Sequence, residues 1–139
     1  LFADIVGFME FSAKDVVCHL GKLFHEIDEL SLSCCVMKIR AVGGCYMAAA
    51  GNCIKLVRFL HLFVFAGVPD PCDAQEHTQN IVRFAFGIQD ALRYHNEQHE
   101  TNFKMRIGIA CGPVTAGVVG NIRYHYDIWY AKIRAGSGY

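Results

Sequence analysis

The chain has little that would tie it to nucleic acid, to a membrane surface or to an oxidising compartment. Lys plus Arg and Asp plus Glu number 13 each, and this balance gives no support for nucleic-acid binding or a polybasic membrane patch. Its seven cysteines include no C-x-x-C pair, so neither a disulfide framework nor a zinc site is indicated. We therefore expect buried free thiols in a reducing cytoplasm.

The sequence also lacks a signal peptide and a convincing membrane span. Asp4 already interrupts the first apolar run, which is not the pattern of a secretory leader. The most apolar stretch, residues 52–67, is short for a bilayer and contains Lys55, Arg58 and His61. A buried extra helix and an exposed apolar excursion are the alternatives for this insertion. Because the chain starts without an initiator methionine, we expect a fragment of a longer protein.

What the sequence does contain is material for one globular domain. Its 139 residues are 53% hydrophobic and 19% charged, enough for a real core. Hydrophobic periodicity and turn residues predict strand, helix, strand, strand, helix, strand, strand over residues 1–139. The expected ranges are a strand ending at Gly7, a helix over 13–31 capped by Ser12, strands 36–42 and 45–50 around Gly43-Gly44, a helix from Asp73 to His99, and strands 103–111 and 114–120. Residues 124–130 are a candidate for one last strand beyond this order.

This order predicts an α+β fold with a ferredoxin-like βαββαβ core and one extra strand. The sheet should be antiparallel, with both helices on one face and the other face free for a ligand or partner. Gly112-Pro113 should turn the chain so that 114–120 forms a hairpin with the strand before it.

Two acids stand out as candidate functional residues. Asp4 lies among apolar residues of a strand, where a carboxylate is costly to bury unless it is paired or binds a cation. The alternative is that its side chain points off the strand edge. Asp127, in YDIW, could accept hydrogen bonds from a base or a sugar, or could simply be a solvated hairpin acid.

Two weaker patterns have structural explanations. The glycine-rich segment 112–120 lacks both the P-loop ending and the G-x-G-x-x-G spacing, so close strand packing explains it better. His95 and His99 stand four residues apart with Glu100 beside them, a spacing that can bind zinc. No third ligand is evident, and histidines are common at helix ends.

Four motifs in order give the sequence a resemblance to class III nucleotide cyclase catalytic domains. LFADIVGF is similar to the family's F-x-D-I-x-G-F-T, and KIRAVGGCYMAAAG is similar to its K-I-K-T-I-G-D-x-Y-M-A-A-x-G hairpin. NFKMRIGIACGPVTAGVVG resembles L-x-x-R-I-G-I-x-x-G-x-V-x-A-G-V-x-G, and YDIW resembles the start of Y-D-x-W-G-x-x-V-N-x-A-S-R-M. The match spans almost the whole chain apart from 52–67, and the chain would cover about the first two-thirds of such a domain.

The resemblance implies conversion of ATP or GTP to the 3′,5′-cyclic nucleotide and pyrophosphate. In the family, two domains pair head to tail, as homo- or heterodimers, and two carboxylates hold two Mg²⁺ or Mn²⁺ ions at the interface. An Asn and an Arg from the partner orient the ribose and stabilise the transition state. A cytoplasmic domain without a membrane span of its own is implied, with anchoring of the parent protein left open.

The family's functional residues carry over to positions of this chain. By resemblance, Asp4 is the first metal carboxylate and Ile5 offers its backbone carbonyl to a metal. Asp127 matches the acid that reads adenine, with Ile128 beside it, and this favours ATP over GTP. The remaining substrate-binding positions are Gly7, Phe8 and Met9 near the triphosphate, and Arg40 in place of the lysine that reads adenine.

The departures from the family pattern fall on catalytic positions. The second metal carboxylate is Gly44 here, and after YDIW the Asn and Arg positions hold Arg134 and Gly138. Arg134 offers charge for a phosphate and is our catalytic candidate. We expect either an adenylate cyclase domain or a catalytically inactive cyclase-homology module that pairs with and regulates a competent partner.

The resemblance also explains the insertion. Without residues 52–67 the sequence would be YMAAAGVPDPCDAQEH, which resembles the family's connection from the hairpin to the next helix. The segment is either a lineage-specific loop or a translated intron, and the spliced transcript would distinguish the two.

Overall fold

The computed structural model describes the whole chain except residues 8–10, 52–57, 60–61, 64–73, 113 and 131–139. It divides into two compact units, residues 1–109 and 110–139, which are described separately. The prediction of a single domain over 1–139 stays a prediction.

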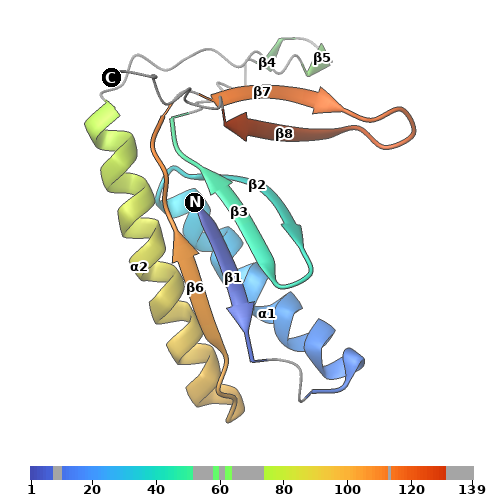
Figure 1. Ribbon diagram of the computed structural model, residues 1–139, viewed down its shortest axis with the longest axis vertical. Helices are drawn as coiled ribbons and strands as arrows, with labels where there is room; N and C mark the ends of the chain where they lie inside the picture. Colours follow the sequence, from blue (N-terminus) through green and yellow to red (C-terminus); the bar gives the residue numbers. More distant parts are fainter. Residues whose placement is uncertain (8–10, 52–57, 60–61, 64–73, 113, 131–139) are drawn as a thin grey trace, which may run out of the picture. The chain divides into compact units, whose positions relative to one another are not determined.

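The first unit is built on a four-stranded antiparallel sheet (Figure 1). Its strands run in the spatial order β2-β3-β1-β6, which is the ferredoxin-like order with the first strand inside the sheet. The predicted α+β fold is confirmed. In chain order the elements are β1 (Phe2–Val6), α1 (Ala13–Ser33), β2 (Met37–Val42), β3 (Cys45–Ala49), α2 (Ala74–His99) and β6 (Lys104–Gly108).

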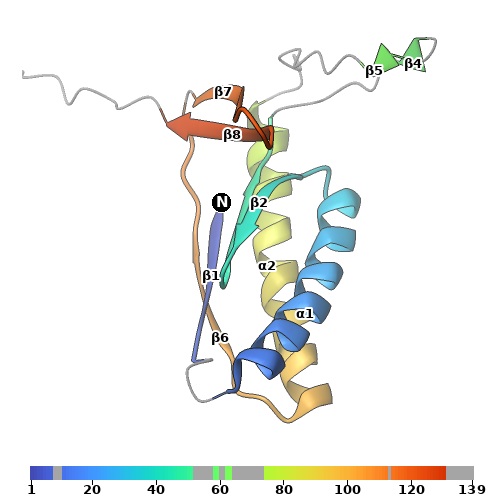
Figure 2. The same ribbon diagram turned by 90° about the vertical axis from the view of Figure 1, so that its right-hand side faces the viewer.

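Both helices cover the same face of this sheet, as expected (Figure 2). Alternate strand residues point to that face, and Ala3, Ile5 and Tyr46 are almost fully buried there. They pack with the apolar stripes of the two helices, chiefly Leu23, Ile27, Phe84 and Ile88. Among the residues of this unit that the structure describes, the opposite face carries no helix, and we call it the open face.

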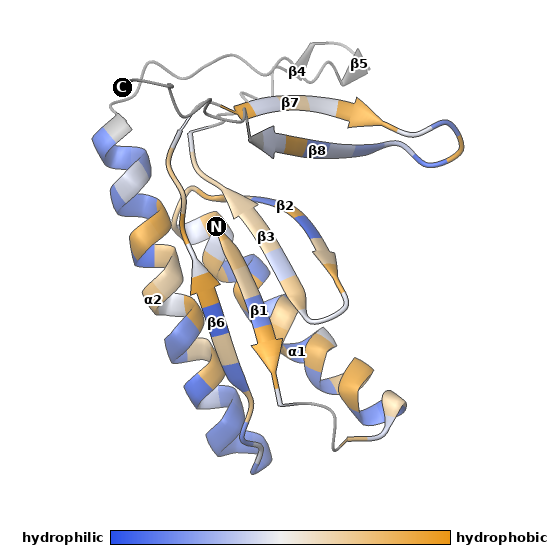
Figure 3. Ribbon diagram, viewed as in Figure 1, coloured by the Kyte–Doolittle hydropathy of each residue, from blue (hydrophilic) through white to orange (hydrophobic). Residues whose placement is uncertain are grey.

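The helices meet closely because one of them has a glycine at the contact. A Cβ built on Gly87 of α2 would lie 2.5 Å from Cδ2 of Leu30 on α1, so a larger residue there would require the Leu30 side chain to shift. Hydrophilic and hydrophobic residues alternate along α2, as its amphipathic sequence predicts (Figure 3).

The predicted start of α1 is confirmed. Ser12 is the N-cap, and its hydroxyl accepts a hydrogen bond from the backbone N–H of Asp15 at 3.3 Å. The Ser12 hydroxyl also donates to the Asp15 carboxylate at 2.6 Å, so the first turn is closed by two reciprocal contacts.

The connection from α2 to β6 depends on one side chain. The amide of Asn96 donates to the carbonyl of Phe103 at 2.9 Å and accepts from the Phe103 N–H at 3.0 Å. It also accepts from the Thr101 hydroxyl at 2.8 Å. These bonds satisfy backbone groups of the loop and fix where β6 begins.

The insertion is described only in part. Two short strands, β4 (Arg58–Phe59) and β5 (Leu62–Phe63), pair antiparallel, so one continuous buried helix over 52–67 is wrong. In the described part of the chain, neither α1 nor α2 is both long and apolar enough to cross a bilayer.

The second unit is a hairpin of β7 (Val114–Val119) and β8 (His125–Tyr130). We expected β7 to form a hairpin with β6; instead its described residues pair with β8 along their whole length. A Cβ on Gly117 would lie 3.8 Å from the Trp129 ring, an ordinary contact distance, so the ring packs across the pair without requiring glycine there.

The cysteine expectation was only half right. The five cysteines in the described part are free thiols. Cys34 is buried and Cys45 half-buried, but Cys18, Cys35 and Cys111 are exposed. Three of the thiols that we expected to be buried therefore lie on helix and loop surfaces.

Candidate active site

The candidate site begins with Asp4 on the open face of the sheet. β1 is an inner strand between β3 and β6, so Asp4 does not point off a sheet edge, and that alternative is wrong. Its carboxylate accepts a hydrogen bond from Nη2 of Arg106 on β6 at 2.6 Å. The two residues are cross-strand partners, and both side chains are partly solvent-exposed. Sequence reasoning did not single out Arg106, although the register of β1 on β6 explains the contact.

The Gly43-Gly44 turn lies directly beside Asp4. Cys45, the first residue after the turn, is the cross-strand partner of Asp4, and the Ile5 N–H donates to the Gly44 carbonyl at 2.9 Å. The two positions predicted to carry metal acids are therefore neighbours across the β1–β3 pair. Their metal roles, and that of the Ile5 carbonyl, stay predictions.

The chemistry of these donors does not fit a two-ion site. Position 44 brings no side-chain oxygen, and the Asp4 carboxylate is already paired with Arg106. Among the residues the structure describes, no group of three or more His, Cys, Asp or Glu side chains is suited to a metal ion. One predicted carboxylate ligand, Asp4, remains.

Arg40 shares the open face with Asp4 because of an irregularity in β2. Arg40 pairs with Met47, and Met47 pairs with Phe2, two residues before Asp4 on the same side of β1. The register shifts between Lys38 and Arg40, which marks a β-bulge. No local pattern of residues predicted this bulge.

The predicted triphosphate loop is described only at its first residue. Gly7 ends β1 with φ of 94°, a conformation that favours glycine. A Cβ there would lie 3.7 Å from the Asn102 carbonyl oxygen, so space does not exclude a larger residue but the backbone angle does. Phe8 and Met9 lie outside the described residues.

The predicted base-reading acid lies in the second unit. Asp127 and Ile128 sit on β8 opposite Gly117 and Ala116, and both are buried, with 6% of each exposed. The Asp127 carboxylate accepts a hydrogen bond from the Ile128 N–H at 2.9 Å. A solvated acid is therefore the wrong alternative. Arg134 and Gly138 lie outside the described residues, so the catalytic role of Arg134 is untested.

The His95–His99 pair gains a third member that sequence spacing could not show. His19 on α1 lies against both, and its Nδ1 is 3.1 Å from Nε2 of His95. Phe103 packs beside His19 and His95. No group of three or more His, Cys, Asp or Glu side chains among the described residues could hold a metal ion, and this includes the three histidines. We therefore assign the cluster to helix packing.

Comparison with known proteins agrees with this geometry. The family model for the adenylate and guanylate cyclase catalytic domain matches residues 1–137. An adenylate cyclase of Mycobacterium tuberculosis is 33% identical over 141 residues, covering 99% of this chain and 28% of the relative. Adenylate cyclase type 9 of Xenopus laevis is 32% identical over 147 residues, covering 99% of this chain and 10% of the relative.

A solved structure matches as well. The guanylate cyclase domain of RhGC from Catenaria anguillulae, in complex with GTP, superposes with a TM-score of 0.71 and 26% identity, covering 93% of this chain and 63% of that domain. The chain thus spans less than two-thirds of each of these proteins. The family match over nearly every residue, together with the sheet order and the adjacent Asp4 and Gly44 positions, leads to one conclusion: the chain belongs to the family of adenylate and guanylate cyclase catalytic domains.

Proposed function

We propose that this chain is an adenylate cyclase-type domain that binds ATP on the open face and takes part in forming 3′,5′-cyclic AMP and pyrophosphate in intracellular signal transduction. The observation that carries the proposal is the meeting of Asp4 and the Gly44 turn on the face that also holds Arg40. The two curated relatives named as adenylate cyclases support the choice of ATP, as does the acid at Asp127.

The reaction requires positive charge around the phosphates. The ribose 3′-oxygen bonds to the α-phosphorus, the bond from that phosphorus to the bridging oxygen breaks, pyrophosphate leaves, and the hydroxyl proton passes to solvent. Arg106 and Arg40 bring guanidinium groups to the open face, and guanidinium groups match phosphate and base acceptors well. Because one carboxylate ligand remains, no step is assigned to a metal ion.

A second cyclase domain is the partner we propose, either another copy or a different chain. The family places ribose-orienting and transition-state groups on the partner, and this chain's own residues at those positions depart from the pattern. The active site around ATP bound to one domain would then be completed by groups of the other domain. We expect weak or no activity from the chain alone.

Restoring the second carboxylate tests the proposal. Gly43 has φ of 58°, whereas Gly44 is outside the positive-φ region, so position 44 can accept an aspartate without backbone strain. We expect Gly44→Asp to raise cyclic AMP formation from Mn²⁺-ATP by roughly tenfold or more, because the ion gains a second oxygen ligand. Mn²⁺ binding, followed by electron paramagnetic resonance, should tighten in parallel.

Two variants make this test specific. Gly43→Asp places the same charge one residue earlier, at the strained position, and should give no gain and a lower melting temperature. The double variant Asp4→Asn with Gly44→Asp should lose the increase in cyclic AMP formation and in Mn²⁺ affinity. Unchanged Mn²⁺ affinity in Gly44→Asp would contradict the proposed site.

The Asp4–Arg106 contact favours a second candidate function. An acid that forms an ion pair with an arginine, beside a turn without a side chain, suits a cyclase-homology module that regulates a competent partner. In that case neither the parent chain nor Gly44→Asp forms product, while addition of the chain changes the activity of an active cyclase domain.

A further inference from the structure

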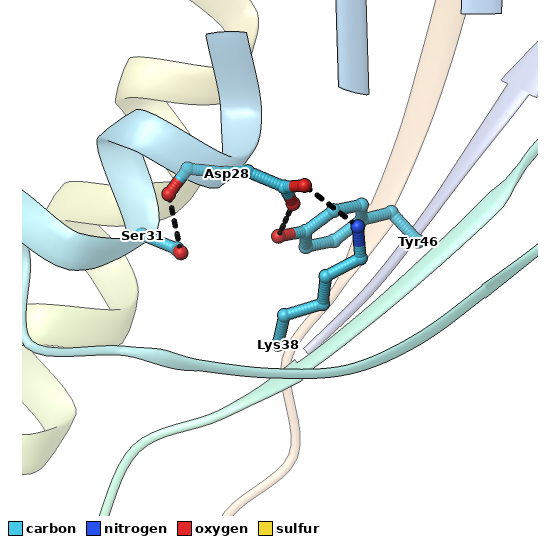
Figure 4. A network of polar contacts seen from close by, with 4 residues as sticks. All are labelled: Asp28, Ser31, Lys38 and Tyr46. Carbon is cyan, nitrogen blue, oxygen red and sulfur yellow. Dashed lines mark hydrogen bonds and ion pairs between the residues drawn. The ribbon is translucent and has the colours of Figure 1, made fainter. Parts of the chain in front are cut away.

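A polar network ties α1 to the two strands that carry the predicted base-binding residue and the Gly44 turn. Asp28 of α1 uses both carboxylate oxygens: Oδ1 accepts from the Tyr46 hydroxyl at 2.7 Å and Oδ2 accepts from Nζ of Lys38 at 2.8 Å (Figure 4). The Ser31 hydroxyl donates to the Asp28 carbonyl at 2.7 Å. Lys38 also lies over the Tyr46 ring, 5.2 Å from its centre.

The Tyr46 end of this network is rigid. The Tyr46 side chain is fully buried between the rings of Phe24 and Phe84. Burial, and then the hydrogen bond to Asp28, raise the pKa of the Tyr46 hydroxyl, so it stays protonated and donates. Asp28 is therefore held by β3 through Oδ1, and its Oδ2 binds Lys38 of β2.

Lys38 and Arg40 lie on opposite faces of the sheet, although residues two apart on a strand normally share a face. Lys38 pairs with Ala48 and Arg40 with the adjacent Met47, so Ile39 is the extra residue of a bulge. Lys38 thus points to the helices, where it reaches Asp28, and Arg40 points to the open face with Asp4.

We propose that Asp28 is a positioning residue: by binding Lys38 it fixes the bulge at Ile39 and so decides that Arg40, and not Lys38, faces the nucleotide. Without the extra residue at Ile39, Lys38 and Arg40 would lie on the same face, because residues two apart on a regular strand share a face. With Lys38 held on the helix side by Asp28, Arg40 reaches the open face only through the bulge. This inference rests on the proposed function, since Arg40 is there the group that contacts the base.

Asp28→Asn tests the inference, because the amide oxygen can still accept from Tyr46 while the charge that holds Lys38 is lost. Titration of the whole chain with fluorescent ATP and GTP analogues in Mn²⁺ should show roughly tenfold weaker ATP binding and a smaller preference for ATP over GTP. Lys38→Met should behave in the same way.

Two controls separate positioning from stability. Tyr46→Phe removes the hydrogen bond that holds Asp28 but leaves the Lys38 contact, and should lower the melting temperature while reducing base preference less than Asp28→Asn does. Asp90→Asn removes the exposed ion pair to Arg93 on α2, which is 2.7 Å long. This variant should change neither the melting temperature nor the base preference.

Amide hydrogen exchange gives a second measurement that needs no nucleotide. Exchange at Ile39 and Arg40 should speed up in Asp28→Asn and stay unchanged in Asp90→Asn. Unchanged exchange together with unchanged base preference in Asp28→Asn overturns the inference and leaves the proposed function intact. If the parent chain binds neither nucleotide, the proposed function fails, and the exchange experiment still decides whether Asp28 fixes the bulge.

Discussion

The buried residue His95 makes the stability of this fold depend on pH. It is 1% exposed, shares a hydrogen bond with His19, and has its ring centre 4.5 Å from that of His99. Its Nδ1 has no partner among the described residues. Burial, followed by the charges of His99, His19 and Lys22, lowers the pKa of His95 to about 4.

This depressed pKa predicts acid sensitivity. The unfolded chain takes up the His95 proton near pH 6.5, and the folded chain does so only near pH 4. The contribution of His95 to stability is therefore complete above pH 6.5 and is lost as pH falls toward 4, by up to about 3 kcal/mol. Urea unfolding between pH 7 and pH 4 measures this loss.

A variant isolates the His95 contribution. His95→Phe keeps a ring of similar size against Phe103 and removes the titrating group, so its stability should fall less steeply over the same pH range. A slope equal to that of the parent chain would assign the acid sensitivity to other groups.

At the scale of the element, the end of α1 is held by a helix-ending motif built on a cysteine. The Val36 N–H bonds to the Ser31 carbonyl at 2.9 Å and the Cys35 N–H bonds to the Leu32 carbonyl at 3.3 Å, which is the Schellman pattern. Cys35 takes the left-handed position of that pattern with φ of 52°. A residue with a Cβ is strained there.

Cys35→Gly should therefore stabilise the protein. Relief of the left-handed strain is expected to raise the free energy of unfolding by roughly 0.5–1 kcal/mol, less the extra entropy glycine gives the unfolded chain. Thermal unfolding measures the change. Cys18→Gly, in the interior of α1, is the matched control and should destabilise by about 0.3 kcal/mol, because glycine is a slightly poorer helix former than cysteine.

For the first unit as a whole, the insertion is the feature that separates this chain from the family pattern. Gly51, just before it, lies against the first turns of α2: a Cβ there would be 3.5 Å from the His77 ring. The end of β3 and the start of α2 are thus already close, and a short loop of about six residues suffices to join them.

Deleting residues 52–67 should leave the fold intact. The junction then reads from Gly51 into Val68, and the melting temperature should stay within a few degrees of the parent value. Loss of this apolar stretch should also reduce aggregation, measured by light scattering. Failure of the deleted chain to fold would show that the insertion contributes to the core; a Gly/Ser segment of equal length is the control for loop length.

Much of the fold followed from local sequence signals. The Ser12 cap, the Gly43-Gly44 turn and the apolar spacing of both helices each act within a few residues, and all three were predicted correctly. The partner of β7 was wrong because hydrophobic periodicity marks a strand but not which neighbouring strand it pairs with; β7 pairs with β8 after it and not with β6 before it. The third histidine was missed because local spacing cannot show a long-range contact: His19 and His95 are 76 residues apart.

For the candidate site, the sequence by itself determined which side chains are present and which are missing: an acid at position 4, a glycine at 44 and an arginine at 40. Tertiary structure alone decided that the first two are neighbours, that Asp4 is paired with Arg106, and that a bulge turns Arg40 to the face of Asp4. The physical reason is that residue identity fixes the chemistry a group can offer. Register, bulges and helix anchors such as Asp28 fix where that group points.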